Sequence, residues 1–213
     1  TIGEIANAPI EQLRYYFGKW GDVLWAFANG YDTSPVLKEN QVEAVKSIGN
    51  STTTPRDLVN FQDVNAVMTV LCDCVARRLR AQGFKAKTLQ ISVRNNQLLT
   101  INKQMTLESP TNITKTITEN ALKLFAQSYN FQTPIRSIGI SLSDFSEDCK
   151  PYQMDLFNNE KQNKRLENLD KTVDVLKQRF GNYSLVTANL LKDPNLSHFN
   201  PYDDHTVHPV GFF

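Results

Sequence analysis

The chain of 213 residues is 40% hydrophobic and 21% charged, a composition that supports a packed core and excludes wholesale disorder. No apolar run approaches the roughly 18–20 residues that a membrane span needs, and we expect no targeting leader. The three cysteines are an odd number, which argues against a self-contained disulfide framework and suits a reducing compartment. We therefore expect a cytoplasmic protein of mixed α and β structure.

The net charge of +1 conceals an uneven distribution along the chain. Residues 46–145 hold twelve Lys and Arg against six Asp and Glu, a local charge of +6, whereas residues 1–45 and 146–213 carry −3 and −2. A basic block between acidic flanks is typical of a protein that binds a polyanion, although a solvated basic surface gives the same count.

Residues 1–31 are predicted to form three short helices. Thr1 and Glu4 match a capping box, in which each side chain satisfies a backbone N–H group of the first turn. Gly18 breaks the second helical stripe before the third begins. The polar and proline-containing stretch over 32–45 then predicts a linker and a domain boundary.

From Val45 onward the pattern predicts the order β-α-β-β-α-β. The predicted elements are a strand over 45–54, a helix over 63–81, strands over 86–94 and 98–107, a helix over 113–129 and a strand over 135–142. Asp63 is expected to cap the first of these helices. We therefore expect an α+β domain over residues 46–148, with a four-stranded sheet and two helices on one of its faces.

The strand positions that face away from the predicted helices carry Ser, Thr, Asn, Gln and Gly, with almost no large apolar group. Basic side chains border this surface: Lys46, Arg56, Lys85, Lys87, Arg94, Lys103 and Arg136. Such a surface can lie close to a phosphate backbone, although any half-exposed sheet has a polar outer face.

Three segments in this order resemble the little-finger domain of Y-family DNA polymerases. They are residues 46–57 (KSIGNSTTTPRD), the helix over 63–81 with its end VARRLR, and the strand KAKTLQISVR. The match is with the UmuC/DinB-type translesion branch, the ImpB/MucB/SamB family. Residues 1–31 resemble the end of the same family's thumb domain, so the resemblance extends through residue 145.

The resemblance implies that the domain grips a template-primer duplex, damaged DNA included, through its backbone and without sequence specificity. The implied role is in DNA repair by translesion synthesis and in damage-induced (SOS) mutagenesis. The residues expected to contact DNA are Lys46, Ser51, Thr52, Thr53, Arg56, Lys87, Arg94 and Lys103. Affinity for DNA is expected to fall steeply with salt.

The same resemblance places the polymerase chemistry in a palm domain upstream of these residues, with Mg²⁺ as its cofactor. Asp63 and Asp73 lie on a predicted helix beside apolar positions, where capping and solvation suit them better than a two-metal site. We therefore expect no catalytic residue, no metal site and no bound cofactor in this chain, and no nucleotidyl transfer by it alone.

Residues 153–157 resemble the pentapeptide by which bacterial proteins bind the sliding clamp. Its members are Gln153, Met154, Asp155, Leu156 and Phe157. The Leu-Phe pair would fill an apolar pocket, the glutamine would hydrogen-bond at the mouth of that pocket, and the methionine would adapt to its shape. The alternative is an ordinary turn that packs its own aromatic residue. The sliding clamp is thus the second expected partner.

The remainder of residues 149–213 is predicted to hold an amphipathic helix over 164–180, which ends at Gly181, and then a flexible tail from Asp193. The helix is expected to pack on the little finger or to serve a further partner. The tail holds His198, Asp203, Asp204, His205 and His208. Metal binding is the alternative for these groups, but they show no fixed ligand spacing.

Four further side chains are given structural roles. Trp20 and Trp25 lie in helical context, so we expect them in a core rather than as platforms for stacked bases. Cys72 and Cys74 are two positions apart on a helix and point in different directions, so they do not form a metal pair.

Two other classes of protein remain open. An RNA-recognition module has the same β-α-β-β-α-β order, but it stacks bases on aromatic residues of its central strands, and the strands over 86–94 and 98–107 have none. A protein-interaction scaffold would use the helix over 164–180 as its working surface. Oligomeric state is left undetermined by the sequence.

Overall fold

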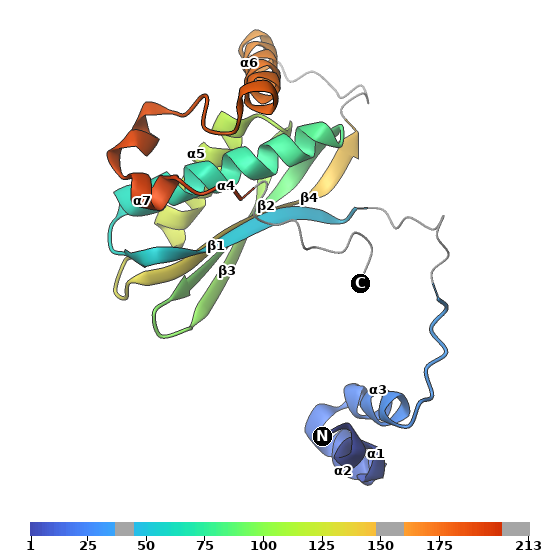
Figure 1. Ribbon diagram of the computed structural model, residues 1–213. Helices are drawn as coiled ribbons and strands as arrows, with labels where there is room; N and C mark the ends of the chain where they lie inside the picture. The colour runs from blue at the N-terminus through green and yellow to red at the C-terminus, as the bar shows by residue number, and fades with distance from the viewer. Residues whose placement is uncertain (37–44, 148–159, 202–213) are drawn as a thin grey trace. The chain divides into compact units, whose positions relative to one another are not determined.

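The computed structural model describes residues 1–36, 45–147 and 160–201 (Figure 1). The chain divides into two compact units, Thr1–Glu43 and Ala44–Phe213, and each is described by itself. No helix within the described ranges is both long enough and apolar enough to cross a membrane.

The first unit consists of α1 (Ile2–Asn7), α2 (Ile10–Phe17) and α3 (Lys19–Ala28), which confirms the three predicted helices. Thr1 and Glu4 form the predicted capping box at the start of α1. Helices α2 and α3 pack closely where Gly21 lies against the Leu13 backbone, since a Cβ there would be 2.5 Å from the Leu13 carbonyl carbon. Trp20 is 69% exposed, so its predicted place in a core is wrong.

The second unit is built on a four-stranded antiparallel sheet in the order β1-β4-β2-β3. The strands are β1 (Ser47–Leu58), β2 (Phe84–Asn95), β3 (Thr100–Thr111) and β4 (Ile135–Glu147). Helices α4 (Phe61–Ala81) and α5 (Thr114–Ser128) both cover the same face of the sheet (Figure 1). The predicted α+β class and the β-α-β-β-α-β order are confirmed.

The core lies between this sheet and the two helices. Every second residue of the central strands points into it, as Leu89, Ile91 and Val93 do from β2, and α4 contributes an apolar face that includes Met68 and Leu71. Since strand side chains alternate in direction, burial of this set leaves the other half of each strand on the outer face of the sheet.

Two local predictions differ from the structure. The N-cap of α4 is Asn60, whose side chain accepts from the Asp63 backbone N–H, so Asp63 lies in the first turn instead of capping it. The strand predicted to begin at residue 98 begins at Thr100, and Leu99, which precedes it, is 64% exposed.

The C-terminal part of the unit folds over the helices. Helix α6 (Glu160–Phe180) begins before the predicted residue 164, and η1 (Ala188–Lys192) and α7 (Pro194–Ser197) follow it. The predicted tail began at Asp193, but Leu196 is buried in the core and the Pro201 carbonyl accepts a hydrogen bond from Asn50. Residues 193–201 therefore belong to the folded domain.

Candidate nucleic-acid interface

The outer face of the sheet is formed by four rows of paired residues, each row crossing all four strands. One row joins Thr53, Ser137, Arg94 and Thr100, and the next joins Ser51, Gly139, Ser92 and Asn102. The third row joins Gly49, Ser141, Gln90 and Gln104, and the fourth joins Ser47, Ser143, Thr88 and Thr106. We call these sixteen positions the outer face.

The chemistry of the outer face is uniform. Hydroxyl and amide side chains and two glycines occupy every position except one, and Arg94 is the single charged residue among the sixteen. None of the sixteen is acidic or aromatic. Such a surface offers many hydrogen-bond donors and does not repel an anionic backbone.

The two glycines of the outer face lie on neighbouring strands and leave a hollow there. Gly49 of β1 and Gly139 of β4, with Ser51, Gln90, Ser92 and Ser141, border a hollow of about 310 Å³. Arg78 of α4 lies at its border, where Nη1 donates to the Gly49 carbonyl at 3.0 Å. The absence of side chains at the two glycines lets a ligand approach the sheet backbone closely.

Substitution of Gly139 is expected to disturb this hollow and the strand pairing beneath it. A Cβ at Gly139 would lie 2.8 Å from the Ser51 Cβ, so Gly139→Ala must separate β1 from β4. We expect the free energy of unfolding, measured by urea denaturation, to fall by about 1–3 kcal/mol. Ser92→Ala, in the same hollow, is the control and should change it by less than about 0.5 kcal/mol. Equal stability of Gly139→Ala and the parent chain would contradict the close packing.

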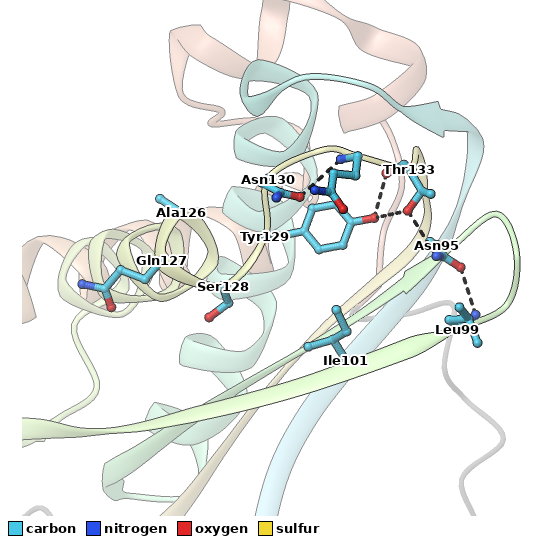
Figure 2. A pocket seen from close by; sticks show the side chains of 10 residues that line it. Asn95, Leu99, Ile101, Ala126, Gln127, Ser128, Tyr129, Asn130 and Thr133 are labelled. Carbon is cyan, nitrogen blue, oxygen red and sulfur yellow. Dashed lines mark hydrogen bonds between the residues drawn. The ribbon is translucent and has the colours of Figure 1, made fainter.

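Arg94 lies at the turn end of the outer face, where an asparagine organises the β2–β3 turn. The Asn95 side-chain oxygen accepts from the backbone N–H group of Gln97. The same oxygen accepts from the backbone N–H group of Leu99, and Asn95 Nδ2 donates to Thr133 Oγ1 at 3.1 Å (Figure 2). Beside it, Arg94 Nε donates to Thr100 Oγ1 at 3.0 Å. The β2–β3 turn therefore positions Arg94, the charged residue of the first row.

A second cavity lies at the same end of the sheet. Ile101 borders it, and because Ile101 pairs with the core residue Val93 it belongs to the face that the helices cover. The cavity has a volume of about 390 Å³ and extends to Tyr129, whose hydroxyl contacts the Thr133 hydroxyl and carbonyl (Figure 2). It is therefore separate from the outer face.

The structure distributes the residues predicted to contact DNA over several places. Ser51, Thr53 and Arg94 lie on the outer face. Thr52 pairs with the core residue Ile138 and Lys103 with the core residue Ile91, which puts both on the side of the sheet that faces the helices. The Lys103 side chain is nevertheless exposed, because β3 is an edge strand.

The two remaining lysines of the predicted set lie toward the other end of the sheet. Lys46 directly precedes β1 and Lys87 lies at the irregular part of β2, and both are exposed. Further residues of the outer face were absent from the predicted set, chiefly Ser137, Ser141 and Ser143 of β4. The period-two alternation of serine with isoleucine and leucine over 137–143 is the signal that could have identified them.

Arg56 is engaged by two carboxylates. Its Nη1 and Nη2 donate to the two oxygens of Asp63, both at 2.9 Å, and Nη2 also donates to Asp193 at 2.8 Å. These hydrogen bonds raise the pKa of Arg56 and hold the pKa of Asp63 and that of Asp193 below the ordinary range for aspartate. The Arg56 charge is thereby neutralised, and its predicted contact with DNA stays a prediction.

The carboxylates considered for metal chemistry also have protein partners. Asp63 pairs with Arg56, and Asp73 accepts from Lys177 Nζ at 2.6 Å. Within the described ranges, no group of three or more His, Cys, Asp or Glu is arranged to hold a metal ion. Cys72 and Cys74 are both buried, and burial raises the pKa of the Cys72 thiol to about 12.

Several predicted residues lie outside the part of the chain that the structure describes. They are the pentapeptide Gln153, Met154, Asp155, Leu156 and Phe157, and the tail residues Asp203, Asp204, His205 and His208. His198 is described, and its ring stacks on Tyr183 with 4.0 Å between centroids.

Comparison with known proteins gives matches over nearly all of the chain. The family model of the impB/mucB/samB family C-terminal domain matches residues 45–156. A DNA polymerase IV of Acetivibrio thermocellus is 42% identical over 197 residues, which cover 92% of this chain and 49% of that protein. A DNA polymerase IV of Alkaliphilus oremlandii is 31% identical, covering 90% and 49%, and a DNA polymerase IV 2 of Bacillus subtilis is 33% identical, covering 88% and 45%. The chain thus spans about half the length of the curated relatives that it matches.

Proposed function

Since this chain belongs to the impB/mucB/samB family and contains the C-terminal, little-finger domain of that family, we propose that the outer face of its sheet binds duplex DNA. The observation that carries the proposal is the composition of that face: sixteen paired positions with hydroxyls, amides and two glycines, one arginine and no acid. A backbone of phosphates can approach such a surface without meeting a like charge.

The same composition explains a lack of sequence preference. Short hydroxyl side chains and strand backbone reach phosphate oxygens, whereas reading bases requires longer bidentate side chains such as Arg or Asn aimed into a groove. Most of the outer face consists of Ser, Thr and Gly, and its longer members are Gln90, Arg94, Asn102 and Gln104. A DNA-gripping domain that is indifferent to sequence also tolerates a damaged template.

The RNA-recognition alternative lacks support from this face. Modules of that class stack two or three bases on aromatic side chains of the central strands. The central strands here are β4 and β2, and their outer-face residues are serine, glycine, threonine, glutamine and arginine. Duplex DNA held by its backbone suits these residues better than an unstacked single strand does.

We place the nucleotidyl transfer and its Mg²⁺ in another part of a translesion DNA polymerase, and we assign this chain a DNA-gripping role in repair and damage-induced mutagenesis. The carboxylates of Asp63 and Asp73 support this assignment, because they form ion pairs with Arg56 and Lys177. Residues 153–157 would bind the sliding clamp and so keep the enzyme on its template.

Binding to a fluorescein-labelled primer-template duplex across a NaCl series tests the DNA proposal. Three exposed cations, Arg94 of the outer face, Lys87 of β2 and Lys103 of the edge strand β3, give an expected slope of log K against log salt of about −2.7. Affinity measured by fluorescence anisotropy should therefore fall about 40-fold between about 50 and about 200 mM NaCl. Absence of binding at the lower salt, or binding that salt does not weaken, would contradict the proposal.

A further inference from the structure

Helix α6 is attached to the rest of the domain through charged side chains. Arg80 of α4 donates to both Asp170 and Asp174 of α6, at 3.2 and 2.7 Å. Lys177 of α6 lies 2.6 Å from Asp73 of α4, and Lys85 of β2 lies 2.7 Å from Glu167 of α6. Asp170 also accepts from the first backbone N–H of α5, that of Thr114, at 2.7 Å. We call these contacts the ionic seam.

The four α6 residues of the ionic seam lie on one stripe of the helix. Glu167, Asp170, Asp174 and Lys177 are spaced by three, four and three residues. Leu166, Leu169, Val173 and Leu176 each lie one position before a residue of the seam, which turns their stripe by about 100°, and Phe180 continues that apolar stripe. The apolar stripe therefore lies beside the ionic seam, where Leu169 and Val173 border a cavity that Val70 of α4 also lines.

Helix α6 is packed less deeply than α4 and α5. No residue of α6 is buried, whereas α4 buries eleven residues and α5 four. Leu169 and Phe180 are 56% and 62% exposed, and Leu166, Val173 and Leu176 are half-buried. Arg80, by contrast, is 4% exposed, so α6 covers this guanidinium and would return it to water on leaving. Separation of α6 would therefore expose half-buried apolar side chains but no fully buried one from this helix, and it would rehydrate the charged groups.

The chain that follows α6 is attached differently. Leu196 of α7 is buried in the main core and Asp193 pairs with Arg56, so this segment is tied to the domain without the ionic seam. An α6 that leaves its seam would consequently stay tethered at its C-terminal side.

We propose that α6 is a detachable strap, in which the ionic seam opens while the sheet, α4 and the α7 anchor stay folded. Most helical stability in proteins comes from tertiary packing, so the opened strap loses much of its backbone protection. Raised salt favours the open state, because dissolved ions stabilise the exposed charges of the separated helix more than they stabilise the partly buried pairs of the closed seam. Helix α6 begins at Glu160, three positions after residues 153–157 in the sequence. The proposal does not depend on DNA or clamp binding.

Hydrogen–deuterium exchange of the full chain, read by mass spectrometry, tests the strap. Raising NaCl from about 50 to about 500 mM should speed exchange in α6 peptides while peptides of α4 and β2 keep their protection. Lys177→Asp should open the seam by facing Asp73 with a like charge, and should speed α6 exchange by about tenfold or more at low salt. Adding Asp73→Lys to that variant exchanges the two charges and should restore most of the protection.

Two control substitutions accompany this test, and three results would contradict the proposal. Lys164→Gln and Lys171→Gln remove charges from exposed positions of the same helix outside the seam, and should leave α6 exchange within about twofold of the parent. The strap is refuted if α6 and α4 lose protection together, or if neither salt nor Lys177→Asp affects α6. Failure of the Asp73→Lys exchange to restore protection would refute the ionic basis of the attachment.

Discussion

Replacing Arg94 with glutamate is expected to weaken binding of primer-template DNA by about 10- to 100-fold at low salt. Arg94 is the single charge on the outer face, is exposed, and is held at the β2–β3 turn by its hydrogen bond to Thr100. The substitution both removes a phosphate contact and places a carboxylate against the backbone. The measurement is fluorescence anisotropy with the labelled duplex, repeated for several unrelated sequences, all of which should be weakened alike.

The matched control makes the same change of charge on the other side of the domain. Lys115 of α5 is 60% exposed and lies in the helical layer, so Lys115→Glu alters the net charge equally without touching the outer face. Arg94→Gln should in addition reduce the salt slope by about 0.9, the value for one lost phosphate contact. If Arg94→Glu and Lys115→Glu weaken binding equally, general charge and not the outer face governs the interaction, and the proposed surface is wrong.

Part of the basic block in the sequence is paired within the domain and is not available to a polyanion. Arg56, Arg80 and Lys85 belong to it, yet they pair with Asp193, with Asp170 and Asp174, and with Glu167, all from the C-terminal acidic flank. The uneven charge distribution along the chain therefore reflects, in part, an electrostatic attachment within the domain. The outer face itself carries one charge, so in the proposed function hydrogen bonding would supply much of its interaction with a phosphate backbone.

Regular periodicity accounts for what could be predicted from the sequence. Alternation over 86–94 and helical spacing over 63–81 report burial directly, and the structure confirms both elements with ends that differ by a few residues. The same rule separates Thr52 from its neighbours Ser51 and Thr53, because a strand turns every second side chain to the opposite face. The prediction that all three hydroxyl residues contact DNA did not take this alternation into account.

Contacts between distant parts of the chain could not be predicted in this way. Arg56 and Asp193 are 137 positions apart, and no local pattern indicates that they meet. The attachment of α6 is a second example, since the sequence left open whether this helix packs on the domain, and in the structure it contacts α4 through Asp174 and Lys177. The partners Arg80 and Asp73 decide which side of the helix faces the domain, and their position depends on the tertiary fold.

Removing two apolar side chains from residues 153–157 is expected to abolish clamp binding. Leu156 and Phe157 would each bury a side chain worth about 1.5–3 kcal/mol, so the double change Leu156→Ala and Phe157→Ala should cost about 3–6 kcal/mol of binding free energy. That loss corresponds to a dissociation constant raised by at least about 10²-fold. Surface plasmon resonance with an immobilised bacterial sliding clamp measures the effect.

A second double substitution, at the two residues that follow the pentapeptide, provides the control. Asn158→Ala and Asn159→Ala change the two positions directly after the pentapeptide and should leave clamp affinity within about threefold of the parent. Duplex binding by the Leu156, Phe157 variant should also be unaffected, because the outer face lies on strands that end before these residues. Undiminished clamp binding by that variant would exclude the pentapeptide as the tether. Loss of duplex and clamp binding together would instead show that the substitutions damage the domain, so the two proposed partners are tested independently.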